Sequence, residues 1–73
     1  MFNRKHPAHN REAVWNLLSG TVVQGVLVKQ AGHQFILRAA SVCEPRPGHG
    51  PEWAQADGEI VIDAANVDYV QVP

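Results

Sequence analysis

The side chains best suited to chemistry in this chain are four histidines and a single cysteine. Histidine nitrogens and cysteine thiolates are common zinc ligands, but only His6 and His9 stand at a ligand-like spacing, and no third ligand accompanies them. Cys43 could act as a nucleophile only beside a general base, and no histidine or acid stands in a recognisable catalytic pattern around it. We therefore expect Cys43 to be a small packed residue, and we expect no metal, no other cofactor and no enzymatic activity.

The charge of the chain is unevenly distributed. Residues 1–11 contain Arg4, Lys5 and Arg11 and no acid, whereas the remainder contains three bases and seven acids, a formal charge of 3 − 7 = −4. A basic arm of this kind could contact nucleic acid or an acidic protein surface. Because three charges are fewer than a dedicated binding tail usually carries, a solvated arm and an arm docked on a partner stay open as alternatives.

The chain is short enough that we expect partner subunits to supply part of its stability. A single domain of 73 residues buries only about 60% of the surface that its unfolded chain exposes. One cysteine excludes an internal disulfide framework and offers no zinc cluster, so oligomerisation is the remaining common means of stabilisation. The apolar runs are too short to span a membrane, and residues 1–10 lack the apolar centre of a signal peptide. We expect a soluble, unsecreted homo-oligomer without a membrane partner.

The elements that must position these side chains begin after an irregular arm. Pro7 stands among polar residues, which predicts that residues 1–10 lack regular structure, and residues 11–73 read as one domain. Residues 11–18 fit two patterns. The apolar positions 14, 17 and 18 share one face of a helix, whereas positions 13, 15 and 17 alternate as in a strand, so both alternatives stay open.

Two longer strands follow in the sequence. The valine-rich run at residues 21–30 predicts the first, and Gly25 within it predicts a strong bend or a close backbone approach. A turn then leads to residues 33–44, where apolar and polar positions alternate. This second strand is long enough to span a small barrel.

A region rich in proline and glycine interrupts the strand pattern at residues 45–58. Its prolines and glycines recur so often that we expect no regular element there. Trp53 stands alone in this polar region. Its side chain could fold back as a plug over the core, or it could contact a neighbouring subunit, because tryptophan is enriched at interface hot spots.

The last third of the chain, GEIVIDAANVDYVQV, predicts two strands joined by a very short bend. Residues 60–62 and 67–72 are apolar β-type runs. The polar residues between them are too few for a helix or a crossover. The chain must therefore turn sharply at residues 63–66.

Together these features resemble the two sequence motifs of the Sm-like proteins. The first motif combines a strand, two spaced glycines, an apolar strand, a short loop and a further strand, and the second is the strand pair at the end of the chain. The matching positions are Leu17, Gly20, Gly25, Leu27, Phe35, Leu37 and Ala40 for the first, and Val61, Ile62, Asn66, Val67, Tyr69 and Val70 for the second. The resemblance implies an all-β fold, a strongly bent five-stranded antiparallel barrel, with at most a short N-terminal helix.

The resemblance also implies that subunits assemble edge to edge into rings of about five to seven copies. The strand at residues 59–63 would pair with a strand of the next subunit and so close each open edge. The expected contacts with a subunit or another partner are Ile60, Val61, Ile62, Trp53, Arg4, Lys5 and Arg11.

Members of this family that bind RNA read single-stranded, uridine-rich RNA in the pore of the ring. The corresponding positions here are His33, Gln34, Asp63 and Ala64, where RNA-binding members carry an asparagine beside a stacking residue, and a basic residue followed by glycine. Gln34 could read a base edge, and His33 could stack on it. Asp63 would place negative charge where phosphates pass, which opposes nucleic-acid affinity.

The function that these features favour is a non-enzymatic, ring-forming subunit with a structural or assembly role. Sm-like domains without the RNA-reading residues occur among small proteins of tailed bacteriophages, and the resemblance is closest to that branch. It implies a minor capsid, decoration or connector component that is cytoplasmic during assembly and then part of the virion, with other phage structural proteins as partners of the basic arm. The alternative is an RNA-binding regulator that recognises single-stranded, uridine-rich RNA.

Overall fold

The computed structural model describes residues 6–44, 48, 50 and 52–73, and it confirms the prediction of an all-β fold. Residues 11–18 supply a strand, because Ala13 and Trp15 are buried at alternate positions. No helix in the described part of the chain is long and apolar enough to cross a membrane. The strands are β1 (Glu12–Leu17), β2 (Val22–Ala31), β3 (Gln34–Cys43), β4 (Trp53–Gln55), β5 (Ile60–Asp63) and β6 (Val67–Gln71), with a 3₁₀ turn, η1 (Ala64–Asn66), between the last two.

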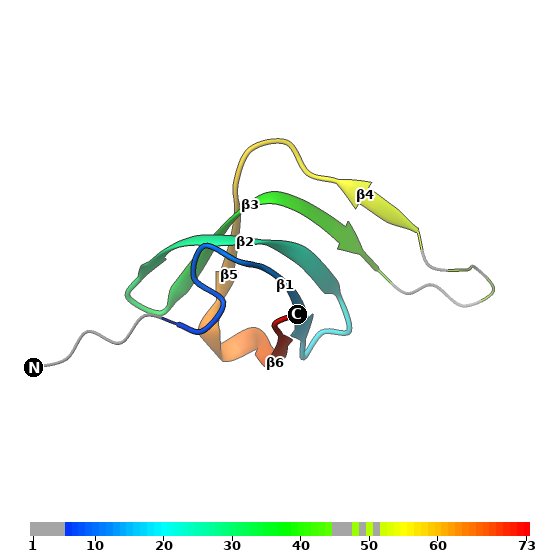
Figure 1. Ribbon diagram of the computed structural model, residues 1–73. Helices are drawn as coiled ribbons and strands as arrows, with labels where there is room; N and C mark the ends of the chain where they lie inside the picture. The colour runs from blue at the N-terminus through cyan, green and yellow to red at the C-terminus, as the bar shows by residue number, and fades with distance from the viewer. Residues whose placement is uncertain (1–5, 45–47, 49, 51) are drawn as a thin grey trace, which may run out of the picture.

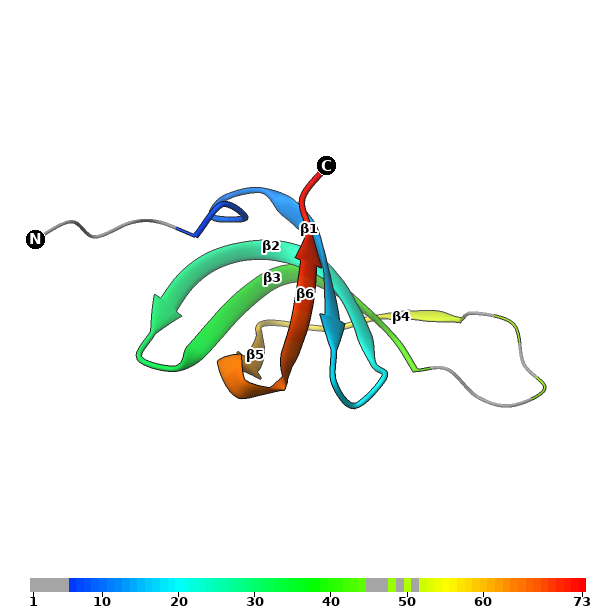
Figure 2. The same cartoon turned by 90° about the horizontal axis from the view of Figure 1, so that it is seen from below.

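These strands form one antiparallel sheet that curves around a core (Figures 1 and 2). Their order is β4-β3-β2-β1-β6, and β5 also pairs with β3, farther along the edge that β4 occupies. The resemblance implies five strands, whereas the structure has six, because the strand after the long loop is divided into β4 and β5. Among the described strands β5 and β6 do not pair with each other, so the sheet is not closed.

The bend in β2 and β3 depends on a close approach between the two strands. A Cβ atom at Gly25 would lie 3.0 Å from the Cβ atom of Ala40 and 3.2 Å from its Cα atom. A larger residue at position 25 would need Ala40 to shift by a few tenths of an ångström, so glycine favours this approach. Ala39 adopts a φ of 51° at the same place, and the register of the two strands shifts across Gly25. Such a bulge bends the ribbon, which confirms the bend predicted from Gly25.

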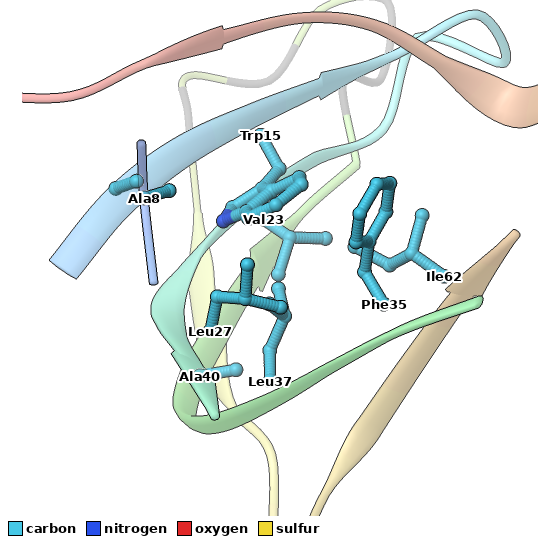
Figure 3. Close-up of a cluster of buried hydrophobic side chains, with 9 residues drawn as sticks. Ala8, Trp15, Val23, Leu27, Phe35, Leu37, Ala40 and Ile62 are labelled. Atoms are coloured by element: carbon cyan, nitrogen blue, oxygen red, sulfur yellow. The ribbon is translucent and has the colours of Figure 1, made fainter. Parts of the chain in front are cut away.

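The core is a cluster of apolar side chains contributed by most of the sheet (Figure 3). Trp15, Leu27 and Leu37 are its largest fully buried side chains. The ring of Phe35 lies 5.1 Å from that of Trp15, measured between centroids, and Ile62 of β5 packs in the same cluster. The remaining buried members are Ala8, Ala13, Val23 and Ala40.

The segment before β1 packs on the sheet. Ala8 is fully buried, and the Asn10 N–H donates to the carbonyl oxygen of Leu27 at 2.7 Å. Residues 7, 8 and 10 lie in turns and His9 forms a single parallel bridge with Leu27, so the segment is irregular as expected. The solvated alternative is therefore wrong for residues 6–10, because their contacts bury apolar surface. The expectations for Arg4 and Lys5 lie outside the described residues.

The proline- and glycine-rich region contains a short strand. The prediction that residues 45–58 hold no regular element is wrong for β4, in which Ala54 pairs with Val42 of β3. The Ala56 N–H then donates to the carbonyl oxygen of Ala40 at 2.8 Å and carries the chain along β3 toward β5. A strand of three residues is too short to give a sequence pattern of its own.

Candidate functional site

β5 is an edge strand with one side free for another chain. It pairs antiparallel with β3, with Ile62 opposite Phe35 and Val61 opposite Ile36, and no described strand pairs with its other side. Ile62 packs into the core, whereas Val61 points to the outer face and is 54% exposed. An edge of this kind presents unpaired N–H and C=O groups to an incoming strand.

β6 is the second edge strand with a free side. It pairs with β1, with Val70 opposite Trp15 and Tyr69 opposite Asn16, and its other side has no partner among the strands that the structure describes. Val70 packs against the core, whereas Tyr69 is 53% exposed. Each of the two edges therefore carries one large apolar side chain on its outer face.

The turn η1 connects these two edges and is fixed by Asp63. The Asp63 Oδ1 atom accepts a hydrogen bond from the Ala65 N–H at 2.9 Å, the arrangement of an N-cap. The Leu18 N–H donates to the carbonyl oxygen of Asn66 at 2.7 Å, which ties the turn to the loop between β1 and β2. Asp63 thus orders the backbone of the turn between the end of β5 and the beginning of β6.

The four residues that the resemblance assigns to RNA recognition lie together beside this turn. Gln34 stands opposite Asp63 in the register of β3 and β5, and the Ala64 N–H donates to the carbonyl oxygen of His33 at 2.7 Å. His33, Gln34 and Asp63 are exposed. The cluster offers an amide and an imidazole that could contact a base, together with a carboxylate that repels phosphate.

An exposed ion pair lies just before β5. The Arg38 Nε atom donates to the Glu59 Oε2 atom at 2.9 Å. Because both side chains are largely in water, this pair contributes roughly 1 kcal/mol or less to stability. It joins the residue before β5 to β3, and in the described ranges neither side chain has a further hydrogen-bond or ion-pair partner.

The other expected contact residues are less uniform than the sequence predicts. Trp53 is 47% exposed on β4, opposite the buried Cys43, so of its two alternatives the plug over the core is wrong and the contact with another chain stays a prediction. Ile62, expected at the subunit interface, is buried in the core instead, and Ile60 packs partly against it. Cys43 is buried, as predicted. Arg11 is exposed.

Neither a metal cluster nor a known relative accompanies these edges in the described part of the chain. No group of three or more histidine, cysteine, aspartate or glutamate residues in the described ranges could hold a metal ion. No protein-family model matches the sequence, and the search of curated proteins finds no match to it either. The features of the described residues that suggest a function are therefore the two edges and the turn between them.

Two residues with prominent places in the structure carry little sequence signal. Asn16 pairs with Tyr69 and Leu17 pairs with Val67, so the register of β1 and β6 shifts just before Tyr69. This bulge puts Val67 and Val70 on the same side of the strand and disturbs the alternation that would mark Tyr69 as outward. The alternation that survives is at residues 69–72. His6 gives no signal, because a short irregular segment has no periodicity.

Proposed function

We propose that this chain is a non-enzymatic subunit that assembles edge to edge with copies of itself and serves a structural role. The observation that carries the proposal is that the outer sides of β5 and β6 have no partner among the described strands, and each strand carries an outward apolar side chain more than half exposed, Val61 on β5 and Tyr69 on β6. A domain this small gains stability when each edge pairs with a second chain. Because β5 of one copy meets β6 of the next, the contact is heterologous, and repetition closes a ring.

The inward side chains select a register for this contact. Ile60 and Val70 both pack toward the core from their edges, so an antiparallel pairing that sets Ile60 opposite Val70 of the next copy continues the core across the contact. The same register sets Val61 opposite Tyr69 on the outer face. An aromatic side chain beside a β-branched one in a cross-strand pair contributes about 0.2–1 kcal/mol, in addition to the backbone hydrogen bonds.

The proposal extends to a minor capsid, decoration or connector component of a tailed-phage particle. Its support is the sequence resemblance to Sm-like proteins, combined with the carboxylate of Asp63 where RNA-binding relatives carry a basic residue. Other structural proteins of the particle would then be partners of the basic residues near the N-terminus.

RNA binding is a second candidate, favoured by the proximity of His33, Gln34 and Asp63 at one end of the sheet. The carboxylate of Asp63 counts against it, because phosphate neutralisation supplies most nucleic-acid affinity. Filter binding to oligo-U over a salt series separates the two candidates. The structural role predicts no saturable affinity that depends on Gln34, whereas RNA recognition predicts saturable binding that Gln34→Ala weakens.

The mass of the protein in solution tests the assembly. Light scattering coupled to gel filtration is expected to give a multiple of the 8.0 kDa chain mass. Val61→Asp puts a charge on the β5 edge and is expected to give a folded monomer. Leu18→Asp is the matched control, because Leu18 is 66% exposed but lies in the loop after β1, so its mass should equal that of the wild type. A wild-type protein that stays monomeric at high concentration contradicts the proposal.

A further inference from the structure

Residues 6–11, which we call the strap, cover one part of the aromatic core. Within the strap, the His9 N–H donates to the carbonyl oxygen of His6 at 2.8 Å, and the Arg11 N–H donates to that of Ala8 at 3.0 Å. The strap is joined to the sheet by a parallel β-bridge between His9 and Leu27, in which the Asn10 N–H donates to the carbonyl oxygen of Leu27 at 2.7 Å, and by the burial of Ala8. So few attachments make a segment that can open while the sheet stays folded.

The His6 side chain supplies the remaining attachment, and it does so in its neutral form. Its ring stacks on Trp15 with centroids 5.3 Å apart and meets Phe35 edge-on at 5.4 Å. Its Nδ1 atom accepts a hydrogen bond from the Ala8 N–H at 3.0 Å. A nitrogen that accepts must be unprotonated, so this contact requires the neutral imidazole with its proton on Nε2.

We propose that His6 is a pH-sensitive switch that holds the strap on the sheet when neutral and releases it when protonated. A second proton on the ring turns Nδ1 into a donor, which ends its hydrogen bond with the Ala8 N–H and places two N–H groups in opposition. The charged ring also loses part of its hydration where it is covered by the strap and the core. Release uncovers Trp15 and Phe35.

Two further observations support a strap that is close to opening. Burial beside the rings lowers the pKa of His6 from its ordinary value of 6.5, because the charged form loses its hydration. In addition, the Trp15 Nε1 atom is buried without a hydrogen-bond partner among the described residues, which is unfavourable for the closed state. Opening of the strap would let water bind this N–H group.

The rings packed against His6 are uncharged, so the switch depends on burial and on the lost hydrogen bond. Of the charged groups on the same elements, Glu12 accepts a hydrogen bond from Gln24, and Arg38 pairs with Glu59. Among the described residues, no hydrogen bond or ion pair joins Glu12 or Arg38 to the imidazole of His6. Besides His6, the titratable or charged residues on the strap, on β1, on β2 and at the start of or along β3 are His9, Arg11, Glu12, Lys29, His33, Arg38 and Cys43.

The pH dependence follows from which state binds more protons. In the open state His6 has a pKa near 6.5, whereas in the closed state its pKa is lower, so a fall in pH favours the open state. Above pH 6.5 the equilibrium is flat. Below it the population of the open state rises by up to about tenfold per pH unit, until the pH falls below the pKa of the closed state.

The test is amide hydrogen exchange of the full-length protein between pH 7.5 and 4.5, expressed as protection factors. The Asn10 amide reports the strap, and the Leu17 amide, which donates to the carbonyl oxygen of Thr21 at 3.0 Å, is the internal reference in the β1–β2 turn. Protection of Asn10 is expected to fall by up to about tenfold per pH unit below 6.5, while protection of Leu17 stays constant. A pH-independent Asn10 amide overturns the proposal.

Two variants assign the effect to one histidine. His6→Phe keeps an aromatic ring but cannot take up a proton, so its Asn10 protection should not change with pH. His9→Gln, which alters the other histidine of the strap, should keep the wild-type response; loss of the response in this variant instead overturns the proposal.

If His6→Phe does not fold, an NMR titration of the wild-type protein decides. The His6 ring-proton shift and the Trp15 indole shift should titrate together below pH 6.5, and a His6 that titrates at its ordinary pKa without a change at Trp15 contradicts the switch. The result does not require ring formation, because the reporting Asn10 amide bonds to Leu27 of β2 and not to β5 or β6.

Discussion

Val61 on β5 and Tyr69 on β6 are outward apolar residues on either side of one three-residue turn, at which β5 ends and β6 begins. One edge therefore leaves the turn along β3, and the other leaves it along β1. Because the two edges differ, they cannot make the same contact twice with one partner copy. We therefore propose a series of copies in which β5 of each copy pairs with β6 of the next.

Gly25→Ala is expected to destabilise the fold. The added Cβ atom would lie 3.0 Å from the Cβ atom and 3.2 Å from the Cα atom of Ala40, so backbone must move to admit it. Overpacking of this kind costs about 1–3 kcal/mol. Denaturant unfolding at one protein concentration measures it. Gly50→Ala is the control, because nothing lies within 4 Å of its added Cβ atom; an equal loss in both variants would contradict this explanation of the bend.

Ala39→Gly is expected to stabilise the fold. Ala39 has a φ of 51°, where a Cβ atom is strained and glycine is not. Relief of the strain exceeds the entropy that glycine loses on folding, so we expect a net gain of about 0.5–1 kcal/mol. Ala54→Gly on β4 lacks the positive φ and should be destabilising. Thermal unfolding of the two variants compares them, and a loss of stability in Ala39→Gly would count against strain at the bulge.

Trp53→Ala is expected to leave the subunit folded. Trp53 is 47% exposed, so its truncation should cost less than about 1 kcal/mol. Trp15→Ala, which removes a fully buried ring, should cost about 3–5 kcal/mol and serves as the comparison. Near-UV circular dichroism and gel filtration report the two effects. A smaller assembly with an intact fold assigns Trp53 to a contact between chains, whereas loss of the fold contradicts its exposed position.

Asp63→Ala is expected to weaken the turn between the two edges. It removes the Oδ1 atom that accepts from the Ala65 N–H at 2.9 Å, and loss of an N-cap costs about 0.5–2 kcal/mol. Asp63→Asn keeps the acceptor and removes the charge, so it should retain most of the stability. The pair separates the cap from the charge. Oligo-U binding that appears in Asp63→Asn would identify the carboxylate as the group that excludes RNA.

Much of the sheet could be predicted from the sequence, because long strands produce long patterns. The valine-rich run with Gly25 gave β2 and its bend, and the short spacing between residues 62 and 67 gave the sharp turn before β6. β4 could not be predicted, because its three residues lie among prolines and glycines whose turn preference dominates any short window.

The side-chain positions were harder to predict than the strands. Ile62 was expected at an interface with Val61, yet the period of two in a strand places them on opposite faces, and only the paired β3 shows which face is inside. The packing of His6 on Trp15 joins residues from a patternless segment and a strand. A contact of this kind depends on tertiary structure alone.

Cross-linking between two single-cysteine variants tests the central claim most directly. Val61→Cys and Tyr69→Cys are each prepared in a Cys43→Ala background, mixed under conditions that allow subunits to exchange, and oxidised. We predict a disulfide between the two different chains, within complexes of the wild-type mass. Neither variant alone should cross-link, and a mixture of Val61→Cys with Leu18→Cys should not cross-link either. A monomeric mass with no cross-link above that control would contradict edge-to-edge assembly through β5 and β6.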